Sequence, residues 1–328
     1  MKRNAVFILI VLFALLVVAA APFAGMIKVP LSVLKNTDLT TTEAQVFYQI
    51  RLPRVFTAFL AGAALACCGV ALQAMFRNPL ATPFTLGISS GAAFGAAICI
   101  IFAAYLPIPY GNIWFSFAGA LAAVLLVYGL TRIKKGFSAD TMLLAGIAVN
   151  FFFSSLILFL QYISDFTQSF RIIHWLMGSI DVTGYQTPVT MLVFTVIGIA
   201  VIVIQRLNLN LMSISDEIAI ARGVDVKNTR KIIFFATSIM VAAVVAYCGP
   251  IGFVGLMAPH ICRLLVGPDH KILTPTSIIF GGAFLVLCDT IARTLIAPAE
   301  MPVGVITALL GGPFFVWLLL KDRGKTVL

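Results

Sequence analysis

Charged side chains are scarce in this sequence. Only 10% of the 328 residues are charged, 12 residues are acidic, and 61% are hydrophobic. Soluble domains carry roughly 25% charged residues, so a soluble enzyme or binding domain is excluded. The apolar residues form blocks of about 20, the length that crosses a ~30 Å hydrocarbon core as a helix. These blocks do not alternate apolar and polar residues as barrel strands do, so the sequence predicts an all-α, polytopic membrane protein.

Paired cysteines and clustered metal ligands are also missing. None of the six cysteines belongs to a CxxC pair. All of them fall inside or at the ends of apolar blocks, where cysteine is usually a small buried hydrophobe. The three histidines are scattered along the chain. We therefore expect no metal site and no cofactor bound by this chain.

Nucleotide-binding and catalytic motifs are absent from the sequence. It contains no GxxxxGK[ST] loop, no HExxH, no GxSxG and no plausible nucleophile–base pair. We therefore expect no catalytic residue and no ATP hydrolysis by this chain, so any ATP-driven step would need another polypeptide. The net charge of +10 does not indicate a nucleic-acid partner, because the basic residues lie in short loops between apolar blocks.

Ten apolar blocks predict ten membrane spans in one transmembrane domain, residues 1–328. The N-terminal run, Ala5–Ala21 after Lys2 and Arg3, resembles a signal peptide but is longer than the usual apolar core of one, and we interpret it as an uncleaved first helix. The predicted spans are 5–24, 55–75, 84–106, 113–133, 139–163, 188–205, 231–248, 251–266, 276–297 and 302–320.

The loop charges predict the orientation. An even number of spans puts both termini on one side of the membrane. If that side is the cytoplasm, 16 of the 22 Lys and Arg residues lie in it and six lie outside. This bias agrees with the positive-inside rule, so we expect a multi-pass protein of the inner membrane with cytoplasmic termini.

The eighth block is not a plain span. Its prolines and glycines disfavour a regular helix, and broken helices within membranes often mark transport paths. We predict a discontinuous helix beside a translocation pathway, and a kinked structural helix is the alternative. The residues concerned are Gly249, Pro250, Gly252, Gly255 and Pro259. Elsewhere, Gly91 and Gly95, and Gly62 and Gly69, indicate close helix crossings.

A short helix is predicted within the cytoplasmic segment 213–224. Serine can cap its start, acids favour its first turn, and a glycine can end it in the left-handed conformation. So short a helix needs a surface to pack on, which is either this chain's own cytoplasmic face or a partner subunit. The residues assigned to it are Ser215, Asp216, Glu217, Ile218, Ala221, Arg222 and Gly223.

Asp289 is the only acid well inside a predicted span, and Arg293 follows one helical turn later. An i,i+4 pair of opposite charge is most simply a structural neutralisation. The alternative is an ion-coupled secondary transporter, in which Asp289 would carry the coupling ion.

Several ordered motifs together resemble the FecCD-type permeases of ABC importers for iron siderophores, haem and cobalamin. The resemblance runs from about residue 45 to the C-terminus. The motifs are RLPR (51–54), QAMFRNPLA (73–81), LGISSGA (86–92), WLMGS (175–179), GPIGFVGLMAPHICR (249–263), DTIAR (289–293) and EMPVGVITALLGGP (300–313).

The resemblance implies the fold and the partners. Such permeases have ten transmembrane helices and work in pairs, here as a homodimer, around a pathway that we expect spans 5, 8 and 10 to line. Two cytoplasmic ATPase subunits bind ATP and Mg, and they push on a coupling helix that corresponds to the segment 213–224. A periplasmic or lipid-anchored binding protein docks outside on arginines that match Arg51, Arg54 and Arg293. For Arg51 and Arg54, snorkelling at the membrane surface is the alternative.

The expected function is import of an iron chelate, a siderophore or haem, by ATP-driven alternating access. Cobalamin is the alternative substrate within the same family. An ion-coupled secondary transporter is the alternative from another class.

Overall fold

Each predicted span overlaps a helix in the computed structural model, which describes all residues except 1, 35–38, 103–107, 109, 135–137 and 322–328. The last part of the predicted span 84–106, residues 103–106, lies outside the described residues. Its described residues form helices and loops, with no strand among them. The long helices are α1 (Lys2–Ala20), α3 (Leu52–Phe76), α4 (Ile88–Phe102), α5 (Gly111–Ile133), α6 (Ala139–Ile163), α8 (Gln186–Ile204), α11 (Val226–Cys248), α12 (Val254–Val266), α13 (His270–Thr294) and α14 (Val303–Lys321).

Seven of these helices are long and apolar enough to cross a membrane, while the described parts of α4, α12 and α14 are shorter. Both α4 and α12 begin inside the bundle, each after an irregular stretch. The segment before α4 is a 3-10 turn, Pro83–Leu86 (η4), and Gly87 lies against Val149 and Asn150, near the middle of α6. The segment before α12 is residues 249–253. Both helices are thus short because their first turns lie within the bundle.

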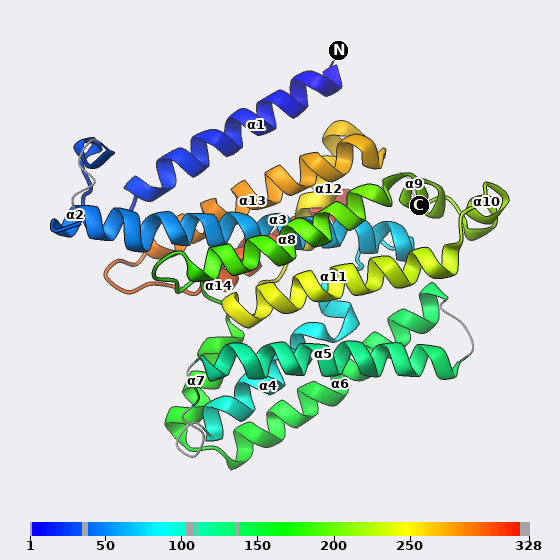
Figure 1. Cartoon of the computed structure of the whole chain (residues 1–328), viewed down its shortest axis with the longest axis horizontal. Coiled ribbons are helices and arrows are strands. Elements are labelled where there is room, and N and C mark those ends of the chain that lie inside the picture. Colours follow the sequence, from blue (N-terminus) through cyan, green and yellow to red (C-terminus); the bar gives the residue numbers. More distant parts are fainter. Residues whose placement is uncertain (1, 35–38, 103–107, 109, 135–137, 322–328) are drawn as a thin grey trace.

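The central helix is α3, whose side chains are buried over most of its length. Helices α8, α11, α12 and α13 surround it. Figure 1 shows α4, α5 and α6 as a group along one edge of the bundle and α1 along the opposite edge, where it packs on α13.

Short helices lie at the two ends of the long ones. Figure 1 places α2 (Thr42–Gln45) at one end and α10 (Asp216–Ala221) at the other. A turn of π-helix, Val46–Arg51, joins α2 directly to α3. The others are η1 (Ala21–Phe23), η2 (Leu31–Leu34), α7 (Phe166–Leu176) and α9 (Arg206–Met212).

Glycines let the helices cross at very short range. A Cβ placed on Gly69 of α3 would lie 1.7 Å from the carbonyl oxygen of Gly255 in α12, and one on Gly91 would lie 2.5 Å from the carbonyl oxygen of Gly119 in α5. No side chain fits at either crossing. The close approach predicted for these small residues is therefore confirmed.

Candidate functional site

The interrupted segment 249–253 forms one wall of a cavity. Gly249 and Phe253 both have φ of +66°, a conformation that glycine tolerates and phenylalanine rarely adopts. Backbone strain of this kind persists only where the surrounding structure holds it, and it clusters at functional sites. The Phe253 ring occupies the space that a side chain at position 311 would need, because a Cβ on Gly311 would lie 2.2 Å from it.

The cavity has a volume of about 600 Å³, and none of its lining residues has a polar side chain. Helix α14, the end of α7, η4 and the interrupted segment all contribute to it. The lining residues are Phe84, Leu176, Met177, Pro250, Gly252, Phe253, Gly304, Val305, Ala308, Leu309 and Pro313. The polar part of this surface therefore comes from the backbone, and no side chain offers a bulky solute a hydrogen bond or a charge.

Two of the predicted pathway residues, Pro250 and Gly252, line this cavity. Gly249 instead packs against Trp175 and Gly178. Phe253, before α12, and residues of α14 also line it, and the role of this cavity as a translocation pathway stays a prediction. Span 5 corresponds to α6, and no residue of α6 lines this cavity. Leu176 and Met177, which follow α6 along the chain, line it instead.

The break in the eighth span is shorter than the sequence predicts. Regular helix resumes at Val254 and continues through Pro259. Proline at position 259 has no N–H for the carbonyl of Gly255, four residues earlier. Gln73 of α3 compensates, since its Nε2 lies 3.4 Å from the Gly255 oxygen and 3.5 Å from the Leu256 oxygen. Gly255 and Pro259, which were predicted to lie in irregular backbone, therefore lie within a helix.

Gln73 also reaches Arg263 at the other end of α12. The Arg263 Nη2 atom donates to Gln73 Oε1 at 3.0 Å, and Gln73 is only 3% exposed. One amide therefore joins both the first turn and the last turn of α12 to α3. This role of Gln73 was not predicted from the sequence. Pro259 could have signalled it, because a proline within a helix leaves the carbonyl four residues earlier without a donor.

At the end of the bundle where α2 lies, Arg54 lies between two carboxylates. Its Nε is 3.0 and 3.1 Å from the two oxygens of Asp289, and its Nη1 is 2.7 Å from Glu300 Oε2. The Asp289 side chain is 1% exposed, Arg54 is 11% exposed and Glu300 is 56% exposed. The inner ion pair is thus shielded from water, and the outer one is open to it.

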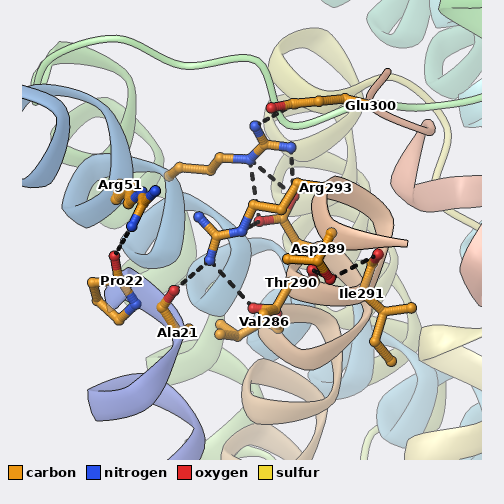
Figure 2. Close-up of polar contacts among 11 residues, drawn as sticks. Ala21, Pro22, Arg51, Val286, Asp289, Thr290, Ile291, Arg293 and Glu300 are labelled. Atoms are coloured by element: carbon orange, nitrogen blue, oxygen red, sulfur yellow. Dashed lines mark hydrogen bonds and ion pairs between the residues drawn. The ribbon is translucent and has the colours of Figure 1, made fainter. Parts of the chain in front are cut away.

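Arg51 and Arg293 point inward to the chain that follows α1, as Figure 2 shows. Arg51 Nη1 donates to the Pro22 carbonyl at 3.0 Å, and Arg51 Nη2 donates to the Ile27 carbonyl. Arg293 Nη2 donates to the Ala21 carbonyl at 2.6 Å. Ala21 and Pro22 belong to η1, the turn directly after α1. The two arginines therefore tie this turn to the start of α3 and to α13.

The three predicted docking arginines are thus brought together, but all are largely buried in the isolated chain, and their docking role stays a prediction. Arg293 does lie near Asp289, with 4.0 Å between Nε and Oδ2. The closer partner of Asp289 is Arg54, which the sequence reasoning missed. Nothing in the sequence signals a pair 235 residues apart.

Helix α10, which the loop charges predict to be cytoplasmic, has the predicted caps. Ser215 Oγ accepts the Ile218 amide at 3.1 Å. Gly223 has φ of +83°, and the Gly223 and Val224 amides donate to the Ile220 and Ala219 carbonyls, a Schellman ending. The backbone amide of Glu217 and the Ser215 hydroxyl lower the pKa of Glu217.

The two faces of α10 differ. Ile218 and Ile220 are 42% and 62% exposed, while Ala219 is fully buried. Asp216 turns inward and accepts both contacts from Arg230 Nη2, at 2.7 and 2.8 Å. The helix thus has an exposed apolar side, and an acidic first residue that holds it to α11. Arg222, which precedes Gly223, is the C-cap of this helix and is exposed.

Comparison with known proteins agrees with this architecture. Residues 6–321 match the model of the FecCD transport family. The chain is 39% identical over 321 residues to a haemin transport system permease of Yersinia pestis, covering 95% of each. It is 40% identical to a cobalamin import system permease of Halobacterium salinarum, covering 84% of this chain and 73% of that one.

A solved structure is also similar. It is described as an inward-facing conformation of a metal-chelate type ABC transporter, and it superposes with a TM-score of 0.84 at 32% identity. The match covers 97% of this chain and 99% of the other. With ten helices in the expected order and a family match over nearly its whole length, this chain belongs to the FecCD transport family.

Proposed function

We propose that this chain is the permease subunit of an ABC importer that carries an iron chelate across the inner membrane, with both termini in the cytoplasm. The end-to-end alignment with a haemin permease carries this proposal. The apolar cavity supports it, because a chelate keeps its metal enclosed and needs no metal ligand on the way. In the described part of the chain, no three His, Cys, Asp or Glu side chains are grouped as a metal site.

The importer needs other subunits. The chain has no nucleotide-binding motif, so ATP and Mg belong to two cytoplasmic ATPase subunits. The exposed Ile218 and Ile220 of α10 give those subunits an apolar surface to bind. A second copy of this chain completes the pathway, and a binding protein delivers the chelate from outside.

The mechanism is alternating access around the interrupted segment. Closure of the ATPases displaces α10, and the bundle changes the side on which the cavity is open. Phe253 is the residue most suited to change conformation, because it already occupies a strained backbone region next to the cavity. The glycine opposite it, Gly311, leaves room for its ring.

Docking of the binding protein is proposed at the outer ion pair. Arg54 is the most exposed of the three arginines, and Glu300 occupies its outward-facing nitrogen. A carboxylate on the binding protein can take the place of Glu300 without breaking the buried contact to Asp289. Arg51 and Arg293 support this site by holding the chain beside it.

Cobalamin is the second candidate substrate, favoured by the similarity to a cobalamin permease. The ion-coupled transporter is disfavoured by the surroundings of Asp289. A coupling carboxylate must gain and lose its ion during each cycle, whereas Asp289 is held by Arg54, with Arg293 nearby. The buried pair is more consistent with a structural role.

Substrate identity is tested in proteoliposomes that contain the chain with its ATPase subunits and binding protein. Uptake of haem, of ferric siderophores and of cobalamin is measured with ATP inside the vesicles. We expect ATP-dependent uptake of haem or a ferric chelate, and no uptake of cobalamin. If only cobalamin were taken up, the substrate would be cobalamin and not an iron chelate.

A further inference from the structure

The ion pair that holds α10 to the bundle lies at the start of α11. Arg230 is 4% exposed, and one of its nitrogens contacts both oxygens of Asp216. A charge-assisted contact to a buried arginine is stronger and better defined than a surface pair. A second cation, Arg77 at the end of α3, lies 3.9 Å from the same carboxylate. Asp216 therefore faces two helices of the bundle, while its neighbours Ile218 and Ile220 face outward.

Helix α11 leads from this ion pair to the cavity. It is continuous from Val226 to Cys248, and a helix of 23 residues is about 34 Å long. Gly249 and the cavity-lining Pro250 follow directly. The Cys248 carbonyl accepts the Ser179 amide at 2.9 Å, so the far end of α11 is also tied to the loop beyond α7. A displacement at Asp216 thus reaches the interrupted segment through one rigid helix.

The end of α3 offers a parallel connection. Gln73 lies one turn before Arg77 and holds α12 through the Gly255 carbonyl and Arg263. Of the two helices that meet at Asp216, α11 therefore ends at the interrupted segment, and α3 holds α12, the helix that directly follows this segment.

We propose that Asp216 is a positioning residue that transmits movement of α10 to α11 and α3, and so to the interrupted segment, rather than a contact residue for the ATPase. This inference rests on the proposed function, in which α10 receives the motion of the ATPase subunits. In this proposal the outward face of α10 binds the ATPase subunit, and the inward carboxylate of Asp216 transmits the movement to the bundle.

The test compares Asp216→Asn with Asp140→Asn in the reconstituted importer. Asp140 is also an acid in the first turn of a helix, at the predicted cytoplasmic end of the span α6, and it is exposed. Three quantities are measured: co-purification of the ATPase subunits, ATP hydrolysis, and substrate transported per ATP. For Asp216→Asn we expect the ATPase subunits to stay bound and to hydrolyse ATP, while transport per ATP falls roughly five- to tenfold. Asp140→Asn should leave all three unchanged, and Asp216→Glu should restore part of the transport.

A double-mutant cycle separates coupling from simple loss of structure. If Asp216 acts through Arg230, combining Asp216→Asn with Arg230→Gln should lower transport per ATP little more than either change alone. If the two changes lowered transport per ATP by the product of their separate effects, the proposal would be overturned. Normal transport by Asp216→Asn would also overturn it. Loss of ATPase co-purification in Asp216→Asn would also overturn it, because that result makes Asp216 a contact residue. Failure of the unmodified importer to take up any substrate with ATP would instead contradict the proposed function itself.

Discussion

Asp289 is the most deeply buried charged residue of the ion pairs between α3 and α13. It is almost completely buried, and two cations from different helices surround it. Burying a carboxylate is costly unless it is paired, and removing one member of a buried pair leaves the other charge uncompensated. The same reasoning gives Glu300 little weight in stability, because most of its side chain is in water.

Replacement of Asp289 by Asn should therefore destabilise the protein by about 3–5 kcal/mol. The loss leaves Arg54 and Arg293 buried near each other without the acid between them. Thermal unfolding of the purified chain in detergent measures the effect. Glu300→Gln is the matched control, and it should cost less than about 1 kcal/mol. Equal effects of the two changes would contradict the assigned roles.

At the scale of elements, α12 is the helix whose construction is least regular. It starts inside the bundle, contains Pro259, and meets α3 where Gly69 and Gly255 touch. Polar groups freed in a membrane must find partners within the protein. Gln73 meets that need for the Gly255 carbonyl, so α3 and α12 are joined by a specific contact as well as by packing.

This contact predicts that Gln73 and Pro259 act together. Gln73→Leu should cost about 1–3 kcal/mol, because the Gly255 carbonyl loses its donor. Pro259→Ala supplies a backbone N–H at the position that can reach this carbonyl. In the Pro259→Ala background, Gln73→Leu should therefore cost about 1 kcal/mol less. Unfolding midpoints of the four variants measure the coupling, and strictly additive costs would refute the assigned contact.

The sequence predicts elements of this kind well where the signal is local. Ten apolar blocks mark ten helices, and Ser215 and Gly223 mark the ends of α10, because capping depends on neighbours within a few residues. The pairing of Arg54 with Asp289 depends on how α3 and α13 pack, which no local pattern records. The contact of Gln73 with α12 is of the same kind. The identity of the cavity residues contributed by α7 likewise depends on a loop folding back over the bundle.

At the scale of the whole molecule, the two ends of the bundle differ. One end has the Arg54–Glu300 pair, and the other has the exposed isoleucines of α10. The apolar cavity lies beside the interrupted segment that α11 connects to α10. The proposed function assigns docking of the binding protein to the first end and coupling to the ATPase subunits to the second.

Charge reversal at the outer surface tests the first of these roles. The double change Arg51→Glu and Arg54→Glu should abolish uptake that depends on the binding protein, because like charges then oppose its carboxylates. Glu300→Gln should leave uptake intact or raise it, since the competing carboxylate is removed. Both are measured against the amount of folded chain in the membrane. Undiminished uptake by the double variant would exclude docking at these arginines.

The most direct test of the central claim asks what drives transport. Uptake of a labelled ferric chelate is measured in proteoliposomes holding the chain, its ATPase subunits and its binding protein, with ATP or with a proton gradient alone. We predict uptake with ATP that persists when an ionophore dissipates the gradient, and none with the gradient alone. Uptake driven by the gradient without ATP, and lost in Asp289→Asn, would contradict the account and make the chain an ion-coupled transporter.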